Sequence, residues 1–151
     1  MTANPLKQLP EHGQSVWYDF IRRDMMTSGE LDRLIDEDGL RGMTTNPAIF
    51  QSAIGKGSLY DTDIVRAGLD LPAQAIFEAI AVEDVQMAAD RFRAVYDATS
   101  ALDGYVSIEV EPDLAYNTEA TIASAASLSA SSMRVLQPSG KPPTRSSVSA
   151  A

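Results

Sequence analysis

The sequence has 151 residues, of which 44% are hydrophobic, and a formal net charge of −9. A chain of this length is expected to form one domain with a substantial core. The acidic charge argues against binding to nucleic acid or to anionic membrane surfaces, because proteins that bind them carry basic patches. There is no cysteine, which excludes disulfides and thiolate metal sites. Neither a membrane-spanning run nor a signal pattern is found, so a cytoplasmic location is the default expectation.

Charge divides the chain into two unequal parts. All 21 acidic residues lie within 1–119 together with nine Lys and Arg, whereas residues 120–151 hold three basic residues and no acid. Half of that second part is Ala or Ser, and the stretch from Met133 onward has prolines and no hydrophobic periodicity. Such a composition buries too little apolar surface to offset the entropy of ordering. We expect a structured part over 1–128 and a disordered or non-native tail over 129–151.

The first predicted elements are a strand and a helix. Ser15–Ile21 is rich in β-branched and aromatic residues, which is typical of a strand. Thr27 and Glu30 form a capping-box pattern, and Gly39 supplies a C-terminal stop. These signals predict a helix of about three turns between them.

The second strand is predicted at Leu40–Thr45 and leads into a short helix. Asn46 is a good N-cap for that helix, and Pro47 suits its first position. A longer helical region extends from 71 to about 99, in one or two pieces, with apolar side chains at helical spacing.

Gly104–Val110 is the third predicted strand, and Thr118 begins a final helix. This alternation predicts parallel strands joined by crossover helices. Each strand carries or ends on polar side chains, namely Asp19 in the first, Thr44, Thr45 and Asn46 after the second, and Glu109 in the third. In barrel enzymes, such side chains converge at the carboxyl ends of the strands, where the chemistry takes place.

Each of these residues also has a purely structural explanation. Helix capping alone accounts for Asn46 and Pro47. A surface ion pair accounts for Asp19, and a solvent-facing strand position accounts for Glu109. No pair of His, Asp or Glu has metal-ligand spacing, so no metal site is predicted. Three strands with a carboxylate or carboxamide near the same end nevertheless favour a shared site.

Three separated blocks of the sequence closely resemble bacterial transaldolases. They are WYDFIRRD at 17–24, GLRGMTTNPAIF at 39–50 and GYVSIEVEP at 104–112, and the resemblance covers residues 4 to about 123. It implies a (β/α)₈ barrel and a transferase of the pentose phosphate pathway that needs no metal or organic cofactor. Such enzymes move a dihydroxyacetone unit from a ketose phosphate, such as sedoheptulose 7-phosphate or fructose 6-phosphate, to an aldose phosphate. A lysine forms a Schiff base with the ketose.

The resemblance also implies roles for individual residues. Asp19 matches the strand-one aspartate, which handles protons on the donor's hydroxyl, and Asn46 matches an asparagine that hydrogen-bonds a substrate hydroxyl. Glu109 matches the strand-three glutamate, which works with an ordered water in proton transfer. Thr44 and Thr45 belong to the motif of Asn46 and are expected to bind substrate.

The tail departs from the family pattern. The fourth strand, whose Met-Ile-Lys-Val-Pro pattern carries the Schiff-base lysine in the family, does not appear here. Lys141 is the only lysine after Lys56, and its Ser-Gly-Lys-Pro-Pro setting is typical of a turn or linker. No Schiff-base lysine is therefore identified. A full barrel takes about 250 residues, so the expected fold is of the α/β class: an incomplete TIM barrel with its first three βα units. We hypothesise that the tail is translated in a shifted reading frame.

Two functions follow as expectations. The first is a transaldolase-family enzyme whose chain, as it stands, is truncated and inactive because it lacks the lysine. The alternative is a non-catalytic partial barrel that acts as an oligomeric or weak sugar-phosphate-binding module. Sugar phosphates are the expected partners in both, with no nucleic acid and no membrane. An exposed barrel edge is expected to favour self-association.

Overall fold

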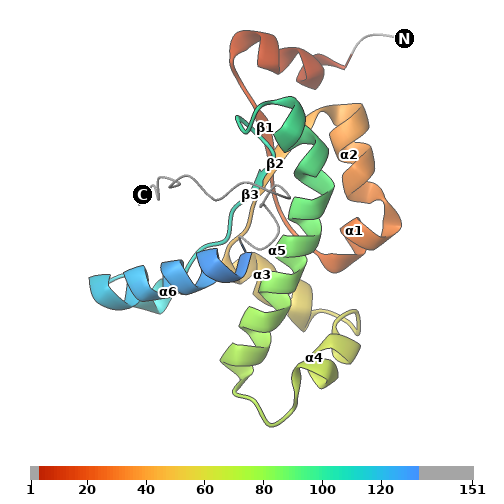
Figure 1. The fold of residues 1–151 in the computed structure, drawn as a ribbon. Helices are drawn as coiled ribbons and strands as arrows, with labels where there is room; N and C mark the ends of the chain where they lie inside the picture. The colour runs from red at the N-terminus through yellow and green to blue at the C-terminus, as the bar shows by residue number, and fades with distance from the viewer. Residues whose placement is uncertain (1–3, 133–151) are drawn as a thin grey trace.

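The computed structural model describes residues 4–132 of the chain. Its three strands are β1 (Val16–Asp19), β2 (Leu40–Thr44) and β3 (Tyr105–Val106), and they form one parallel sheet in the order β1-β2-β3 (Figure 1). Helices separate the strands along the chain, as parallel pairing requires. The predicted α/β fold with parallel strands is confirmed, and it is consistent with part of an α/β barrel.

Eight helical elements accompany the sheet in the described part of the chain. They are η1 (Pro5–His12), α1 (Arg23–Ser28), α2 (Glu30–Asp38), α3 (Pro47–Gly55), α4 (Asp61–Ala67), α5 (Ala73–Ala98), η2 (Pro112–Leu114) and α6 (Thr118–Ser132). The long helix α5 runs the length of the sheet, while η1 lies at one end of it and α3 and α4 lie at the other (Figure 1).

The core lies between the sheet and helices α1, α2 and α5. Its fully buried side chains include Met43 of β2, Leu31 of α2 and Phe92 of α5. Apolar residues of α5 that face this core recur three or four positions apart, which is the spacing of one helix face. The opposite face of the sheet bears Trp17 and Tyr105, which are 39% and 36% exposed.

Two sequence signals at the helix ends had different outcomes. Gly39 ends α2 in the left-handed conformation, with φ of 71°, which confirms the predicted stop. The predicted capping box is wrong: Thr27 lies inside α1, and its hydroxyl donates to the backbone carbonyls of Arg23 and Asp24. The chain instead turns at Gly29, whose φ of 82° both ends α1 and precedes α2.

The third strand is shorter than predicted. Only Tyr105 and Val106 pair as a strand with β2, flanked by backbone bonds from Gly104 to Arg41 and from Ser107 to Met43. The long helical region is one helix, α5, and the sequence reading missed α4 entirely. Helix α6 continues to Ser132, past the domain boundary predicted at 128/129. The remainder of the predicted tail, 133–151, lies outside the described residues, and that boundary stays a prediction.

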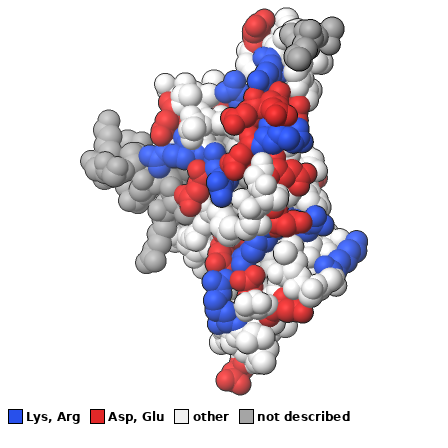
Figure 2. All heavy atoms as spheres, turned by 90° about the vertical axis from the view of Figure 1, so that its right-hand side faces the viewer, with Lys and Arg blue, Asp and Glu red and all other residues white. Residues whose placement is uncertain are grey.

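Charged side chains are interspersed on the face of the molecule that carries α1 and α2. Figure 2 shows Lys and Arg next to Asp and Glu over this face, without a large area of one sign. Ion pairs account for part of the pattern, such as Arg33 with Glu37 within α2 and Arg91 of α5 with Asp32 of α2. No helix in the described part of the chain is long and apolar enough to cross a membrane.

Candidate functional site at the carboxyl end of the sheet

The carboxyl ends of β1 and β2 bring Asp19 and Thr44 together. The two residues are register partners across the parallel pair, and the Thr44 hydroxyl donates to Asp19 Oδ1 at 2.7 Å. Asp19 is exposed and Thr44 is half-buried, so one face of the carboxylate stays open to a ligand. The hydrogen bond fixes where that carboxylate points, which suits a group that accepts or returns a proton.

Asn46 follows two residues later as the N-cap of α3. Its backbone is extended, and its Oδ1 accepts a hydrogen bond from the Ile49 amide at 2.9 Å. Pro47 occupies the first turn of the helix, so both predicted capping features are confirmed. Because Oδ1 is used by the cap, the Nδ2 group is the part of the side chain left to donate. It has no partner among residues 4–132.

Thr45 has its side chain inside the protein. It is fully buried, and its hydroxyl donates to the carbonyl of Ser107 at 2.7 Å, which ties the end of β2 to the chain just after β3. A substrate-binding role for Thr45 stays a prediction. Its position favours an indirect contribution, in which it holds the two strand ends at a fixed separation.

Glu109 lies three residues beyond the end of β3 and is exposed. It lines a small cavity of about 20 Å³ together with Pro47 of α3 and Glu111. Glu109 makes no hydrogen bond or ion pair with any residue in the range 4–132. The structure therefore brings Asp19 and Thr44 into contact, with Asn46 next in the same segment, and places Glu109 beside the start of α3 without a direct bond to any of the three.

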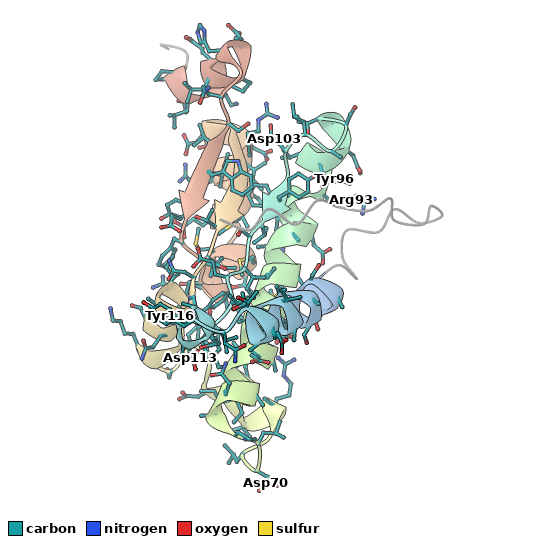
Figure 3. The ribbon with its side chains drawn as sticks, turned by 90° about the vertical axis from the view of Figure 1, so that its left-hand side faces the viewer. Asp70, Arg93, Tyr96, Asp103, Asp113 and Tyr116 are labelled. Carbon is teal, nitrogen blue, oxygen red and sulfur yellow. The ribbon has the colours of Figure 1, made fainter. Side chains whose placement is uncertain are left out.

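The end of the sheet that carries these residues is also where the chain turns toward α6. Asp113 and Tyr116 lie in that connection, at the opposite end of the sheet from Asp103 (Figure 3). No group of three or more His, Cys, Asp or Glu within residues 4–132 is arranged to hold a metal ion. The described site therefore offers a carboxylate, a hydroxyl and an amide donor, which suits binding and proton transfer with a polyhydroxylated ligand.

A buried polar cluster next to this site was not found from the sequence. The Arg23 side chain, 9% exposed, donates to Asp84 Oδ1 at 2.6 Å, and the Tyr60 hydroxyl donates to Asp84 Oδ2 at 2.6 Å. The Tyr60 oxygen also accepts the Arg23 backbone N–H at 2.8 Å. Asp63 and Glu83 complete the ion pairs around the guanidinium. We call these five residues the Arg23 cluster.

The Arg23 cluster joins the start of α1 to α4 and α5. Burial raises the pKa of Asp84, and hydrogen bonds from Tyr60 and Arg23 offset this only in part. Burial also raises the pKa of Tyr60, to which the bond with Asp84 adds. The signal in the sequence was Asp84 itself, a carboxylate four residues after Ile80 and four before Ala88 on the apolar face of α5.

Comparison with known proteins identifies the family of this chain. A family model described as "Transaldolase/Fructose-6-phosphate aldolase" matches residues 16–136. The match thus extends past residue 123, where the resemblance seen in the motifs ends. It includes β1, β2, β3 and all the candidate site residues at their carboxyl ends.

Individual relatives agree with the family model. The chain is 47% identical over 128 residues to "Transaldolase 2" of Nostoc punctiforme, an alignment that covers 83% of this chain and 33% of the relative. It is 48% identical over 125 residues to "Transaldolase 2" of a Nostoc sp. strain, covering 81% and 32%. The match to "Transaldolase 2" of Streptomyces avermitilis is 45% over 127 residues, covering 83% and 34%. The chain thus spans about a third of the length of these relatives, and it belongs to the transaldolase/fructose-6-phosphate aldolase family.

Proposed function

We propose that this chain carries the part of a transaldolase sugar-phosphate site that the first three strands contribute. The observation that carries the proposal is the Thr44–Asp19 hydrogen bond at the carboxyl ends of adjacent parallel strands, with the Asn46 amide two residues away. In this arrangement Asp19 exchanges protons with a donor hydroxyl, and Asn46 donates to another. Glu109 serves proton transfer through a water molecule.

The reaction of the whole site is the transfer of a dihydroxyacetone unit between sugar phosphates in the pentose phosphate pathway. The donor is a ketose phosphate, such as sedoheptulose 7-phosphate or fructose 6-phosphate, and the acceptor is an aldose phosphate. A lysine amine attacks the ketose carbonyl and loses water to form the Schiff base, which accepts the electron pair released by C–C cleavage. A cytoplasmic location fits such a metabolic role.

The chain by itself is proposed to bind the sugar without turnover. Lys7 lies in η1, at the end of the sheet opposite Asp19, and Lys56 follows the end of α3. Neither stands on a strand, and the third lysine, Lys141, lies outside the described residues. A nucleophilic lysine needs a pKa lowered by burial or by a neighbouring cation, and exposed Lys7 and Lys56 lack the burial. This favours the binding-module alternative for the chain as given.

Borohydride trapping tests the absence of turnover. The purified chain is incubated with fructose 6-phosphate and sodium borohydride, and its intact mass is compared with a control that lacks the sugar. We expect no sugar-dependent adduct, because no described lysine can form the Schiff base at the site. A reduced adduct mapped to Lys56 or Lys141 would show that the chain does contain a nucleophilic lysine, and the non-catalytic assignment would then be wrong.

Binding tests the site itself. Fructose 6-phosphate is titrated into the wild type, Asp19→Asn and Asp70→Asn, and complex formation is followed by calorimetry. Asp70 is an exposed aspartate in the loop before α5, far from the sheet (Figure 3), which makes it a matched control. We expect weak binding that Asp19→Asn reduces and Asp70→Asn leaves unchanged. Equal effects of the two substitutions would remove Asp19 from the site.

Copies of the chain are also proposed to self-associate. Among the described residues, β1 and β3 each pair only with β2, so each presents one unpaired backbone edge. Trp17 and Tyr105 are partly exposed on the open face of the sheet. Unpaired edges next to exposed aromatic side chains favour pairing with another chain.

A further inference from the structure

A cleft lies at the amino-terminal end of the sheet, opposite the candidate site. It has a volume of about 370 Å³ and is bordered by η1, α2, the start of β2 and the last turns of α5. Figure 1 shows η1 and the C-terminal end of α5 at this end of the sheet, away from α3. Arg41 is the second residue of β2 and Thr44 is the last, so at about 3.3 Å per strand residue the two are about 10 Å apart.

The cleft combines cationic and apolar walls. Lys7 and Arg41 supply the positive charge, and Asp36 is the single acidic residue among those that line it. The remaining walls are apolar or lack a side chain: Pro10, Ile35, Gly39, Ala94, Val95 and Ala98. A cleft of this size with few polar groups on an apolar wall has the usual form of a small-molecule site.

Arg41 differs from every other arginine within residues 4–132. The other six each have a carboxylate oxygen within 3.4 Å, in the pairs that begin at Arg22, Arg23, Arg33, Arg66, Arg91 and Arg93. The Arg41 guanidinium has no carboxylate partner and no hydrogen-bond acceptor in that range, although the residue is half-buried. In a chain with 21 acidic and 12 basic residues, an arginine without a carboxylate is unexpected.

The neighbouring helix ends do not use the two cations either. At the end of α5, the Val95 carbonyl accepts from the Thr99 backbone and hydroxyl. At the end of α2, Gly39 donates to the Leu34 carbonyl, and the Asn4 amide donates to the Glu37 carbonyl. Lys7 has no described partner of its own. Two cations that complete neither an ion pair nor a helix cap are available to a ligand.

From this arrangement we propose that the cleft binds the phosphate group of a small monoester with an apolar body. The planar guanidinium of Arg41 takes two phosphate oxygens, the Lys7 ammonium takes a third, and the body of the ligand packs on Val95 and Ile35. The site is separate from the one that contains Asp19, so it does not rest on the transaldolase proposal.

Equilibrium dialysis with radiolabelled inorganic phosphate, at neutral pH and low ionic strength, tests the charge of the site. The variants are Arg41→Gln, Lys7→Gln and two matched controls: Arg22→Gln, whose arginine is paired with Asp24 beyond the end of β1, and Lys56→Gln, an exposed lysine outside the cleft. We expect a dissociation constant on the order of 1 mM for the wild type. Arg41→Gln should weaken it about tenfold and Lys7→Gln about fivefold.

The controls should bind phosphate as the wild type does. Loss of binding in Arg22→Gln or Lys56→Gln but not in Arg41→Gln would place the phosphate elsewhere and overturn the proposal, as would the absence of saturable binding to the wild type. Circular dichroism checks that Arg41→Gln is folded. If it is not, Lys7→Gln decides the question, because Lys7 is exposed on η1 and its substitution leaves the core intact.

Phenyl phosphate as a competitor tests the apolar wall. If the ligand is an ester whose body packs in the cleft, phenyl phosphate should displace labelled phosphate at about one tenth of the concentration that unlabelled phosphate requires. Ala94→Asp, which puts a carboxylate into that wall, should abolish the advantage. Equal potency of the two competitors would overturn the assignment of an ester and leave a site for free phosphate alone.

Discussion

Gly42 shows how a single residue fixes the face of the sheet that carries the candidate site. A Cβ built on Gly42 would lie 2.6 Å from Trp17 Cε2, which is closer than non-bonded atoms approach. Trp17 and Gly42 are register partners, so the indole lies directly over the glycine. The absence of a side chain at 42 is thus what lets the aromatic ring of β1 pack flat against β2.

Gly42→Ala is therefore expected to displace the indole. Because Trp17 is 39% exposed, the ring has room to move, and the cost should be about 1–2 kcal/mol of unfolding free energy. Trp17 is the only tryptophan, so its fluorescence reports the movement directly as a shift to longer wavelength. Gly55→Ala is the control, since a Cβ there meets nothing within 4 Å. An unchanged spectrum in Gly42→Ala would contradict the packing described.

Asn46 has a capping role that can be separated from its proposed role in binding. Asn46→Ala removes the acceptor for the Ile49 amide and should cost about 1 kcal/mol of unfolding free energy. Asn46→Asp keeps an acceptor oxygen at the same position and should retain that stability. It removes the Nδ2 donor, however, and should weaken fructose 6-phosphate binding.

Urea unfolding at fixed protein concentration and calorimetric titration of the sugar measure the two effects. If Asn46→Asp loses stability but keeps binding, the capping role described for the side chain and its proposed role as a donor are both wrong.

At the scale of elements, the Arg23 cluster holds α4 and α5 against the start of α1. Tyr60 is 1% exposed, and its hydroxyl bonds both Asp84 and the Arg23 backbone N–H. Tyr60→Phe leaves that buried N–H without its partner and should cost about 2–3 kcal/mol of unfolding free energy, as measured by urea unfolding. Tyr116→Phe is the control, because Tyr116 is fully exposed and should change nothing. A cost below the error of the control would mean that the cluster does not hold these helices together.

The same cluster predicts how stability changes with pH. Burial raises the pKa of Asp84 above its ordinary value, so the folded state holds this proton more tightly than the unfolded chain. The contribution of Asp84 is therefore largest below the unfolded pKa and is lost as the pH rises through the raised pKa. Glu83 has the opposite sign: burial raises its pKa, but hydrogen bonds to Arg66 and Arg23 lower it further. Its contribution is present above the unfolded pKa and is lost as the pH falls.

Asp84→Asn removes one of these two titrations and leaves the other. The unfolding free energy of the wild type minus that of Asp84→Asn should therefore fall as the pH rises from acid toward neutral. Urea unfolding across this range, with Glu83 present in both proteins, measures the difference. A difference that grows with pH would mean that the ion pair with Arg23 outweighs burial and that the direction of the Asp84 shift is wrong.

The elements differ in how well local sequence signals predicted them. Gly39 and Asn46–Pro47 were correct because caps and stops depend on a few adjacent residues. Thr27 failed because Gly29, two residues on, ends α1 and turns the chain before α2 begins. The extent of β3 depends on where β2 offers partners, and residues 107–110 have strand-like composition without a full set of them.

The candidate site shows the same division. That Asp19 and Thr44 lie at strand ends followed from the sequence, because polar residues interrupt apolar runs there. Their hydrogen bond did not, because it depends on the register between β1 and β2, which includes a shift between Val16 and Trp17. The Arg23 cluster joins residues up to 61 positions apart, and no local pattern encodes such a separation.

At the scale of the whole molecule, one face of the sheet is covered and the other is open. Helices α1, α2 and α5 bury the side of β2 that carries Met43, whereas Trp17 and Tyr105 lie on the opposite side and stay partly exposed. A three-stranded parallel sheet with one covered face is unusual, because parallel sheets are normally buried on both faces. The open face and the two free edges should therefore determine how the chain behaves at high concentration.

We expect self-association that increases with concentration, because pairing at a free edge satisfies backbone groups and buries exposed aromatic surface at once. Sedimentation velocity over a range of concentrations measures it. Tyr18 of β1 is 40% exposed, and Tyr18→Lys places a charge beside the free edge, which should shift the protein toward the monomer. Tyr116→Lys, in the connection before α6, makes the same chemical change away from the strands and should not. A wild type that stays a monodisperse monomer throughout would show that the described edges are protected, and the open face would then need no partner.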